Sequence, residues 1–556
     1  MSKSGKGYRS RIEVLELRRH VIGRSPDADA RLAEALERLP QTAASLQELH
    51  DLFLFVEAHP ASPSQLEVAR HGLVAIAAHV LKPAHERLRS ALRDSGISGT
   101  ETVGLYSLTL VRWLLAHWPK DVRLSSVEAS VDELAELLRP MLTEAEREAM
   151  DMHDGDVASL MALLFGKDPC KQLLDLVELL DAHPASDELR ETLFARLQVY
   201  ISISSGFPSL TALRGPAHPT FIHADSLQRG VDLHATVAKG IGPPLALNKR
   251  QRSQLVNDAR AILCLMQRET DPITYAQEVQ AFDMGRGLVI ALFHMDAAHR
   301  LALESYVGFM AFKNGVPLGY GGAWLFPARS KVGINVFPSL RGGESAWFFA
   351  QLLRLYRQRF GVGVFEAENY QLGYGNADGL KSGAYWFYYR LGFRPWDERL
   401  GRIAAREVER MLRNKAYQPP LRTLKELVAD GLVLRVADES SPMVDTSALI
   451  HAAQQHALGN MARSRQQMLA EAERRARKAF GLTRAECARP GIAVALKAWS
   501  LPLNLLGEYE RWPPAELKRM GRALRAKAAS NEDAYQAGLR ECTMLLRSWA
   551  EASKQT

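Results

Sequence analysis

A change of hydrophobic period near Leu288 constrains the fold of this chain more than any other feature. From about residue 10 to 200, apolar residues recur at three- and four-residue spacing, which predicts helices. From Leu288 onward, the apolar residues instead form short continuous runs, two of which are separated by Lys313-Asn314-Gly315. Asn-Gly between two apolar runs is typical of a tight β-hairpin. The chain therefore combines a sheet region with helical regions on either side.

Strands and helices alternate in a definite order through the sheet region. The predicted strands are 288–293, 305–312, 316–326, 331–337 and 362–368, and the predicted helices are 344–360 and 380–391. The order β-β-β-β-α-β-α implies an α+β fold in which helices pack on a mixed sheet. We expect this α+β fold to be flanked by all-α N-terminal and C-terminal regions.

The length of 556 residues is too great for one compact core, so several domains are expected. We predict a helical N-terminal region over residues 1–202 and a connecting segment, rich in Gly and Pro turns, over 203–250. The sheet region then covers 251–400, and a mostly helical C-terminal region covers 401–556.

Composition places the chain among globular proteins, with 47% hydrophobic and 24% charged residues. The polar, basic N-terminus has no apolar export segment, and the longest apolar run nearby, 72–80, is about half of a ~20-residue membrane span. We expect a cytoplasmic protein without a membrane span. The four cysteines form no Cys-x-x-Cys pair, so we predict neither a metal site nor disulfides. A formal net charge of +7 permits an anionic partner but does not require one.

One segment has the pattern of a phosphate-binding turn. Val336-Phe-Pro-Ser-Leu-Arg341-Gly342-Gly343-Glu344-Ser345-Ala346 is predicted to be a strand end, a Gly-rich turn and a helix start. In such a turn, several backbone N–H groups and the helix N-terminus point toward one place, which suits an anionic phosphate.

A second segment lies about forty residues later. Ala384-Tyr-Trp-Phe-Tyr388-Tyr-Arg-Leu-Gly392-Phe393 is an aromatic helix that places a phenol shortly before a Gly-Phe strand start. Together the two segments resemble the GNAT acyltransferases, the Gcn5-related N-acetyltransferase superfamily. The resemblance covers about residues 290 to 400 and implies a GNAT-like mixed sheet.

The resemblance implies a site for the coenzyme A pyrophosphate. In the family, the fourth strand leads into a turn written Arg/Gln-x-x-Gly-x-Gly/Ala, and Arg341 and Ala346 take its first and last positions. The central glycine falls on Glu344, so either Gly343 takes over through a one-residue shift or the donor is bound in another way. The family's asparagine corresponds in kind to Asn376, which lies about five residues too far upstream. The implied donor-binding residues are Val336, Arg341, Gly342, Gly343, Ser345, Ala346 and Asn376.

The resemblance also implies catalytic residues. Tyr388 would be the general acid that reprotonates the departing thiolate, although aromatic residues cover every face of this helix and core packing is its other interpretation. An amine acceptor needs a base, because its ammonium form is not nucleophilic. Glu366 and Glu368 share one face of a predicted strand and are the candidate bases, unless they pair with arginines. Glu304 and His294 are the alternatives.

The sequence therefore predicts an N-acyltransferase that moves an acyl group from a thioester, with acyl-CoA as co-substrate, to an amine on a small molecule or protein. An acyl carrier protein or an aminoacyl-tRNA stays open as the donor. The non-enzymatic alternative is a catalytically degenerate GNAT-fold scaffold in which Glu344 prevents donor binding. A serine hydrolase built on Gly343-Glu344-Ser345 is disfavoured, because Trp347 replaces the last glycine of G-x-S-x-G.

The basic run 472–478 in the C-terminal region has two interpretations. It could contact nucleic acid or lipid, or it could be the solvated face of a helix in an Arg-rich protein. The second interpretation is favoured.

Overall fold

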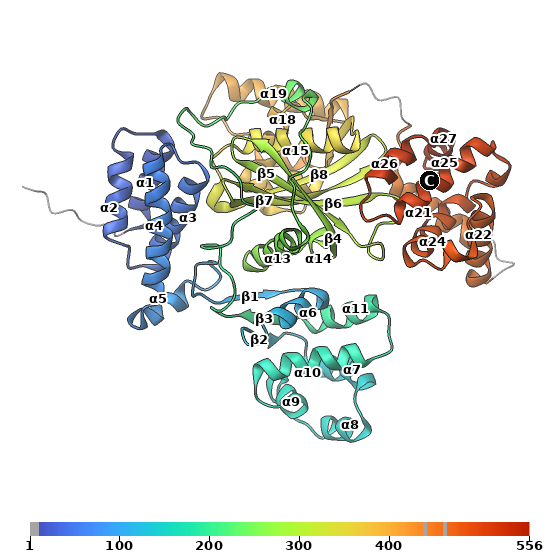
Figure 1. The fold of residues 1–556 in the computed structure, drawn as a ribbon, viewed down its shortest axis with the longest axis horizontal. Coiled ribbons are helices and arrows are strands. Elements are labelled where there is room, and N and C mark those ends of the chain that lie inside the picture. The colour runs from blue at the N-terminus through green and yellow to red at the C-terminus, as the bar shows by residue number, and fades with distance from the viewer. Residues whose placement is uncertain (1–9, 438–441, 460–463, 555–556) are drawn as a thin grey trace, which may run out of the picture.

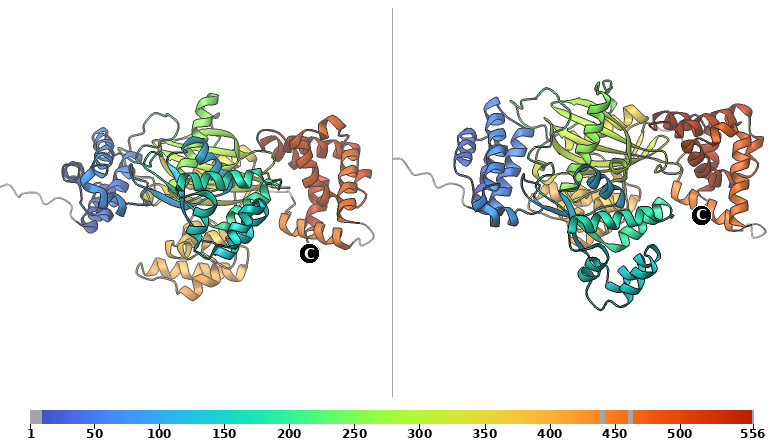
Figure 2. Two further views of the ribbon diagram at one scale, coloured as in Figure 1. Left: turned by 90° about the horizontal axis from the view of Figure 1, so that it is seen from below. Right: turned by 60° about the horizontal axis from the view of Figure 1, so that its bottom comes forward.

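The computed structural model describes residues 10–437, 442–459 and 464–554, and it confirms a mixed α+β protein. An eight-stranded sheet lies at the centre, with a helical bundle at each end and a small sheet with its own helices below (Figure 1). Figure 2 shows the same separation of regions from two further directions.

The N-terminal bundle consists of five helices that precede any strand. They are α1 (Arg11–Gly23), α2 (Ala28–Glu37), α3 (Ala43–Ala58), α4 (Pro63–Val80) and α5 (Glu86–Ala91). Eleven of the sixteen residues of α3 are buried, because this helix lies between the other helices and the central sheet. The bundle and one face of the sheet therefore share a single hydrophobic core.

Residues 1–202 were expected to be helical throughout, and this expectation was wrong for the part from Thr102 onward, which includes a small sheet. This part contains an antiparallel sheet in the order β1-β3-β2, formed by β1 (Thr102–Leu105), β2 (Val122–Val127) and β3 (Val199–Ile203). Its helices are α6 (Leu108–His117), α7 (Val131–Leu138), α8 (Glu144–Asp151), α9 (Val157–Phe165), α10 (Pro169–Ala182) and α11 (Asp187–Leu197). The strands are short and isolated between longer helices, so the helical period dominates the sequence pattern.

A connecting segment with few regular elements leads to the large sheet. Its helix α12 (Leu233–Ala238) packs against α15 (Ser345–Phe360). Helices α13 (Lys249–Leu265) and α14 (Asp271–Thr274) follow it in the chain. The strand order of the large sheet is β10-β11-β9-β8-β7-β6-β5-β4. Its strands are β4 (Ala276–Gly285), β5 (Leu288–Met295), β6 (Ser305–Lys313), β7 (Val316–Phe326), β8 (Arg329–Val336), β9 (Val364–Ala367), β10 (Arg394–Pro395) and β11 (Leu432–Arg435).

The predicted hairpin is confirmed between β6 and β7. Asn314 and Gly315 both have positive φ, 47° and 83°, as a two-residue hairpin turn requires. Strand β5 is buried on both faces: Leu288, Ile290 and Leu292 point into one core, and the alternate residues point into another. This double burial explains a continuous apolar run where a half-exposed strand would alternate.

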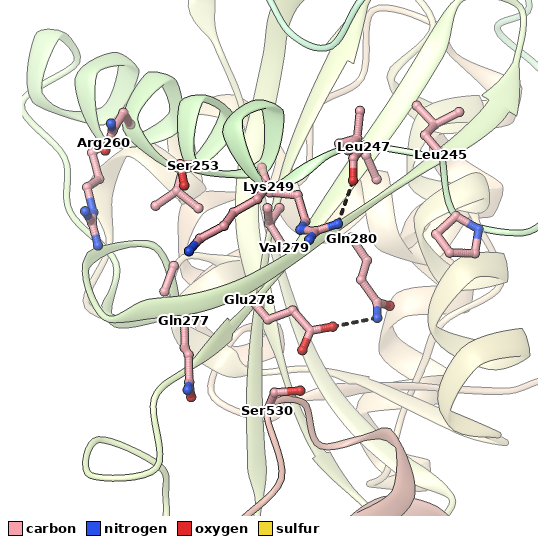
Figure 3. Close-up of a pocket in the computed structure, with 16 residues that line it drawn as sticks. Leu245, Leu247, Lys249, Ser253, Arg260, Gln277, Glu278, Val279, Gln280 and Ser530 are labelled. Atoms are coloured by element: carbon pink, nitrogen blue, oxygen red, sulfur yellow. Dashed lines mark hydrogen bonds between the residues drawn. The ribbon is translucent and has the colours of Figure 1, made fainter.

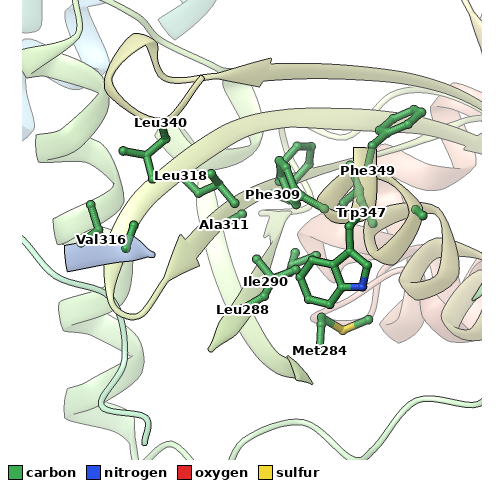
Figure 4. Packing of buried hydrophobic residues seen from close by; sticks show 14 of the residues in the cluster. Met284, Leu288, Ile290, Phe309, Ala311, Val316, Leu318, Leu340, Trp347 and Phe349 are labelled. Atoms are coloured by element: carbon green, nitrogen blue, oxygen red, sulfur yellow. The ribbon is translucent and has the colours of Figure 1, made fainter. Parts of the chain in front are cut away.

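Helices cover both faces of the large sheet (Figure 1). One face, here called the α15 face, carries α15 (Ser345–Phe360) and α18 (Ala384–Arg390); the other, the α13 face, carries α13 and α14. Figure 4 shows Trp347 and Phe349 of α15 against Ile290 and Phe309 of the strands.

The chain around α15 supplies most of the remaining elements near the sheet. These are α16 (Asn369–Leu372), α17 (Ala377–Ser382), α19 (Glu398–Arg413) and α20 (Leu421–Leu427). The single helix expected over 380–391 is divided into α17 and α18, because Gly383 adopts a left-handed conformation with φ of 70°. Strand β11 pairs with β9, so the sheet region continues past residue 400.

The C-terminal bundle docks on the loop before β6. Its helices are α21 (Thr446–Gly459), α22 (Arg465–Ala479), α23 (Arg484–Cys487), α24 (Pro490–Asn504), α25 (Pro514–Lys527), α26 (Asp533–Arg540) and α27 (Thr543–Ala552). Lys527 forms a buried ion pair with Glu532 and donates to the Glu304 carbonyl at 2.8 Å, while Arg300 donates to the Lys527 carbonyl at 2.6 Å. Among the described helices, none combines the length and the apolar character needed to cross a bilayer.

Candidate functional site

The Gly-rich turn joins β8 to α15 as the sequence predicted. A short 3₁₀ helix at Pro338–Leu340 follows Val336, and the Nε of Arg341 donates to the Val336 carbonyl at 3.3 Å across the turn. Gly342 has φ of 85°, and nothing lies within 4 Å of where its Cβ would be. Only glycine adopts this conformation without strain, so the turn depends on Gly342 for its shape.

Several amides of the turn have no hydrogen-bond acceptor within the described chain, and those of Gly342, Ser345 and Ala346 belong to residues that are not buried. Within the described chain, the N–H groups from Gly342 to Trp347 donate no hydrogen bond, and the first bond of the helix runs from the Phe348 N–H to the Glu344 carbonyl. Ser345 and Ala346 are the first two residues of α15, where the positive end of the helix dipole lies. The turn therefore has the donors that a phosphate site needs.

Glu344 turns its side chain into the protein. The carboxylate is 2% exposed and accepts hydrogen bonds from the Lys313 Nζ at 2.7 Å, from the Gln228 N–H at 2.8 Å and from the Arg286 guanidinium. Burial alone would raise the pKa of Glu344, but the neighbouring His223 ring, the Lys313 charge and these hydrogen bonds outweigh it and hold the pKa far below its ordinary value.

Because the Glu344 carboxylate is buried, it is not positioned to repel a phosphate bound at the turn. A carboxylate enclosed by Lys313, Arg286 and His223 does not lie on the exposed side of the turn. The Glu344 side chain instead anchors the start of α15. The exposed side is formed by Gly342 and by Arg341.

The N-terminal bundle also supplies residues to this turn, and no sequence pattern predicted their position. Arg18 of α1 donates to the Ser339 carbonyl at 2.7 Å and to the Arg341 carbonyl at 3.3 Å. His59, at the end of α3, covers Gly343: a Cβ on Gly343 would lie 2.9 Å from its ring. Burial beside Lys313 and His223 lowers the pKa of His59 to about 3, so its ring is neutral near pH 7.

Strands β8 and β9 run parallel and separate at the same end as the turn. They pair through Arg329 with Val364, Ser330 with Phe365 and Lys331 with Glu366, and their ladder includes no further pair although β8 continues to Val336. Beyond the ladder, Gln371 of α16 lies against β8, since a Cβ on Gly333 would be 3.0 Å from its Nε2.

The two candidate bases lie beside this parallel pair, and each has a cationic partner. The Arg329 Nε lies 3.1 Å from the Glu366 carboxylate, and the Lys331 Nζ lies 3.0 Å from that of Glu368. Glu366 is 14% exposed and Glu368 is 43% exposed, so only the second is open to solvent to a large degree. Both carboxylates therefore form ion pairs with basic residues, which is the alternative to their role as bases.

Aromatic residues continue the row of Lys331 and Glu366 across the α13 face. In register with them are Trp324 and Tyr306, whose rings stack at 4.2 Å with an interplanar angle of 8°. Burial would lower the pKa of Lys331, but Glu368, Glu304 and Glu366 outweigh it and raise the pKa. Lys331 thus pairs with Glu368 and feels the charges of two further carboxylates, Glu304 and Glu366, the second of which is itself paired with Arg329.

Tyr388 lies inside an aromatic cluster. Its ring meets Phe349 of α15 edge-on at 5.4 Å and Phe393 at the same distance, and it is 2% exposed. Burial raises the pKa of Tyr388 well above its ordinary value, so the phenol stays protonated but becomes a weaker acid. The phenol donates no hydrogen bond within the described residues.

The remaining candidates have mainly structural surroundings. Asn376 caps α17, accepting from the Gly379 N–H and donating to the Tyr370 carbonyl, each at 3.1 Å. His294 is buried, and burial lowers its pKa to about 4, so it does not face a substrate. In the part of the chain that the structure describes, no hydrogen bond links the Ser345 hydroxyl to a histidine, as a serine hydrolase would require.

Two basic residues of the run 472–478, Arg474 and Arg475, form ion pairs within the bundle. Arg475 forms an ion pair with Glu510 and donates to Asn504 at 2.8 Å, and Arg474 pairs with Glu471. These contacts favour the interpretation of a helix face that stabilises its own bundle.

Comparison of the chain with models of known protein families, with curated proteins and with solved structures found no match. The case for a function therefore rests on the geometry of the turn, of the separating strands and of the carboxylates beside them.

Proposed function

We propose that the protein is an N-acyltransferase that takes its acyl group from a thioester donor, acyl-CoA in the first instance, and transfers it to an amine. One observation carries the proposal. β8 and β9 are the one parallel pair in the described sheet, they separate after three residue pairs, and the free amides from Gly342 to Trp347 lie at that same end. Ligands of sheets with parallel strands bind outside the carboxyl ends of those strands, where neighbours diverge.

The donor would be held by its phosphates at the turn. Backbone N–H groups at the start of α15 bind the anionic oxygens, and Arg341 adds a positive charge on the exposed side. The acyl chain would then pass between β8 and β9 beyond Lys331, in the gap where Gln371 now lies against β8 and has to move aside. This arrangement places the thioester close to the residues that surround the gap on the α13 face.

The carboxylates beside the gap suit an amine acceptor. The amine arrives as an ammonium group, which the cluster of Glu304, Glu366 and Glu368 attracts. Glu368, the more exposed carboxylate, accepts a proton directly or through water, and the free amine attacks the carbonyl carbon. The C–N bond forms, the C–S bond breaks, and Tyr388, assigned by resemblance alone and located on the α15 face, gives its proton to the thiolate. The second proton, which leaves the nitrogen of the tetrahedral adduct, restores the phenol.

A scaffold without catalysis is the second candidate, and two observations favour it. Tyr388 is enclosed by aromatic rings, and His59 covers the backbone at Gly343. In a scaffold, both features would stabilise the fold and the turn would hold no donor.

Donor binding separates the two candidates. Acetyl-CoA, longer acyl-CoAs and free CoA are titrated while the melting temperature of the full chain is recorded. A donor at 100 times its dissociation constant stabilises the folded protein by ~2.7 kcal/mol. Gly342→Ala and Arg341→Ala should each reduce this gain.

A matched control is Gly507→Ala, because Gly507 also has positive φ and open space around its Cβ but lies in the C-terminal bundle. The control should keep the full gain. Absence of stabilisation by every acyl-CoA in the unchanged protein would support the scaffold. Mass spectrometry of amines and lysine peptides incubated with mixed acyl-CoAs then identifies the acceptor.

A further inference from the structure

A cavity lies away from the turn, between helix α13 and the outer edge of strand β4. Its volume is about 760 Å³, within the range of ligand-binding clefts. Figure 3 shows Lys249, Ser253 and Arg260 on the side of α13 and Gln277 to Gln280 on the side of β4. The proposed acyl transfer uses none of these residues.

The floor of the cavity is a strand edge with unused hydrogen-bonding groups. β4 is the last strand of the sheet, and outside its ladder with β5 the described backbone of β4 makes one main-chain hydrogen bond, from the Leu245 N–H to the Ala281 carbonyl at 2.7 Å. Because alternate residues of a strand direct their N–H and C=O groups to the same side, those of Val279 also point outward. The chain turns away after Leu247 to begin α13, and within the described residues the Val279 N–H and C=O groups form no main-chain hydrogen bond on this side.

The walls of the cavity are predominantly cationic. Lys249, Arg252 and Arg260 line it, and none of them forms an ion pair with a described carboxylate. Arg252 donates to the Leu247 carbonyl at 2.6 Å, and Arg260 donates to the Thr274 carbonyl at 2.8 Å, so both guanidinium groups keep their net charge. The one carboxylate in the lining, Glu278, is occupied by Gln280 at 2.9 Å and by Asn531.

An open strand edge favours an extended peptide, and a cationic wall favours acidic side chains. Added strands gain affinity from main-chain hydrogen bonds and specificity from alternate side chains. We propose that the cavity binds an extended acidic peptide segment, which pairs with the outward N–H and C=O groups of Val279 on the β4 edge and directs carboxylates toward Lys249 and Arg252. The peptide would continue the pairing that Leu245 begins.

The probe is a set of heptapeptides selected from a random displayed library on the full chain, then synthesised with a fluorescent label. The selected peptides should carry Asp or Glu at alternate positions, and their affinity, measured by anisotropy, should fall at least tenfold for the variant Lys249→Glu/Arg252→Glu. The control variant is Arg422→Glu/Lys425→Glu, which makes the same change at the same spacing on exposed positions of α20. It should bind as the unchanged protein does.

Methylation of peptide amides tests the strand pairing itself. N-methyl groups at one set of alternate residues should abolish binding, and those at the other set should not, because only one set faces β4. Equal effects of both sets, or full displacement of the peptide by millimolar inorganic phosphate, would show a simple anion site and overturn the proposal. Selected peptides that bind equally well to the Lys249→Glu/Arg252→Glu variant would overturn it too.

Discussion

The Lys313 Nζ lies 2.7 Å from a carboxylate oxygen of Glu344, and the two side chains are only 1% and 2% exposed. Lys313 ends β6 and Glu344 precedes α15, so the pair joins the sheet to the helix that begins at the candidate donor site. Burial lowers the pKa of Lys313 to about 8, and the carboxylate opposes that shift. The start of α15 is therefore held by charge as well as by its apolar packing.

Removing the Glu344 charge should destabilise the protein strongly. In Glu344→Gln, the buried ammonium of Lys313 and the guanidinium of Arg286 lose their anion, and loss of one partner of a buried pair costs ~3–5 kcal/mol. Calorimetric unfolding of this variant, of Lys313→Met and of the double variant measures the coupling. The double variant should lose less than the sum of the two single losses, and simple additivity would contradict the pairing.

Acid should remove the same contribution. The folded pKa of Glu344 is far below the unfolded value of ~4.3, so its stabilisation is complete above that value and is lost as the pH falls toward the folded pKa. The difference in unfolding free energy between the unchanged protein and Glu344→Gln should be constant from pH 7 to 5. Below pH 4 it should shrink by ~1.4 kcal/mol per pH unit. A difference that stays constant down to pH 3 would refute this assignment.

Tyr388→Phe distinguishes catalysis from packing at the aromatic cluster. The hydroxyl makes no hydrogen bond in the described part of the chain, so the melting temperature should change little. If Tyr388 reprotonates the thiolate, as proposed, kcat should fall ~10²–10⁴-fold. The reaction is followed with the donor and acceptor identified by mass spectrometry. An unchanged kcat would leave Tyr388 with a packing role alone.

Glu368→Gln tests the proposed base. The ion pair with Lys331 is partly exposed, and such pairs contribute ~0–1 kcal/mol, so stability should be nearly unchanged. The rate of acylation should fall at least ~10-fold, because proton acceptance by a positioned group is lost. Glu398→Gln on α19 removes a comparable partner of Arg402 far from the gap and serves as the control. Equal effects of the two changes would exclude Glu368 as the base.

The central elements of the sheet could be predicted from the sequence because local signals agree with the fold there. Asn314-Gly315 has the backbone that its residue types favour, and the run from Leu288 is buried on both faces. β4 was not predicted, because its edge position leaves polar residues such as Gln277 and Glu278 along a strand that carries no clear alternation. Contacts formed only in the tertiary structure, such as Arg18 and His59 on the turn, have no sequence signal.

The candidate site was predictable to a similar extent. The turn and the start of α15 follow from the Gly-rich pattern, and the parallel direction of β8 and β9 follows from the helix that connects them. The direction of the Glu344 side chain does not, because its partners come from elsewhere in the fold: Arg286 from the turn between β4 and β5, and Lys313 from the end of β6. A sequence pattern specifies which residue stands in a turn, whereas the surrounding fold decides where its side chain points.

The position of β11 has a consequence for biosynthesis. β11 lies between β9 and β10 in the sheet, although it follows both in the chain. When Pro395 has emerged from the ribosomal exit tunnel, every other strand of the large sheet has emerged too. The outer edge of β9 still lacks its neighbour at that stage. The nascent chain must therefore keep that edge from pairing with other polypeptides until Arg435 has emerged from the exit tunnel.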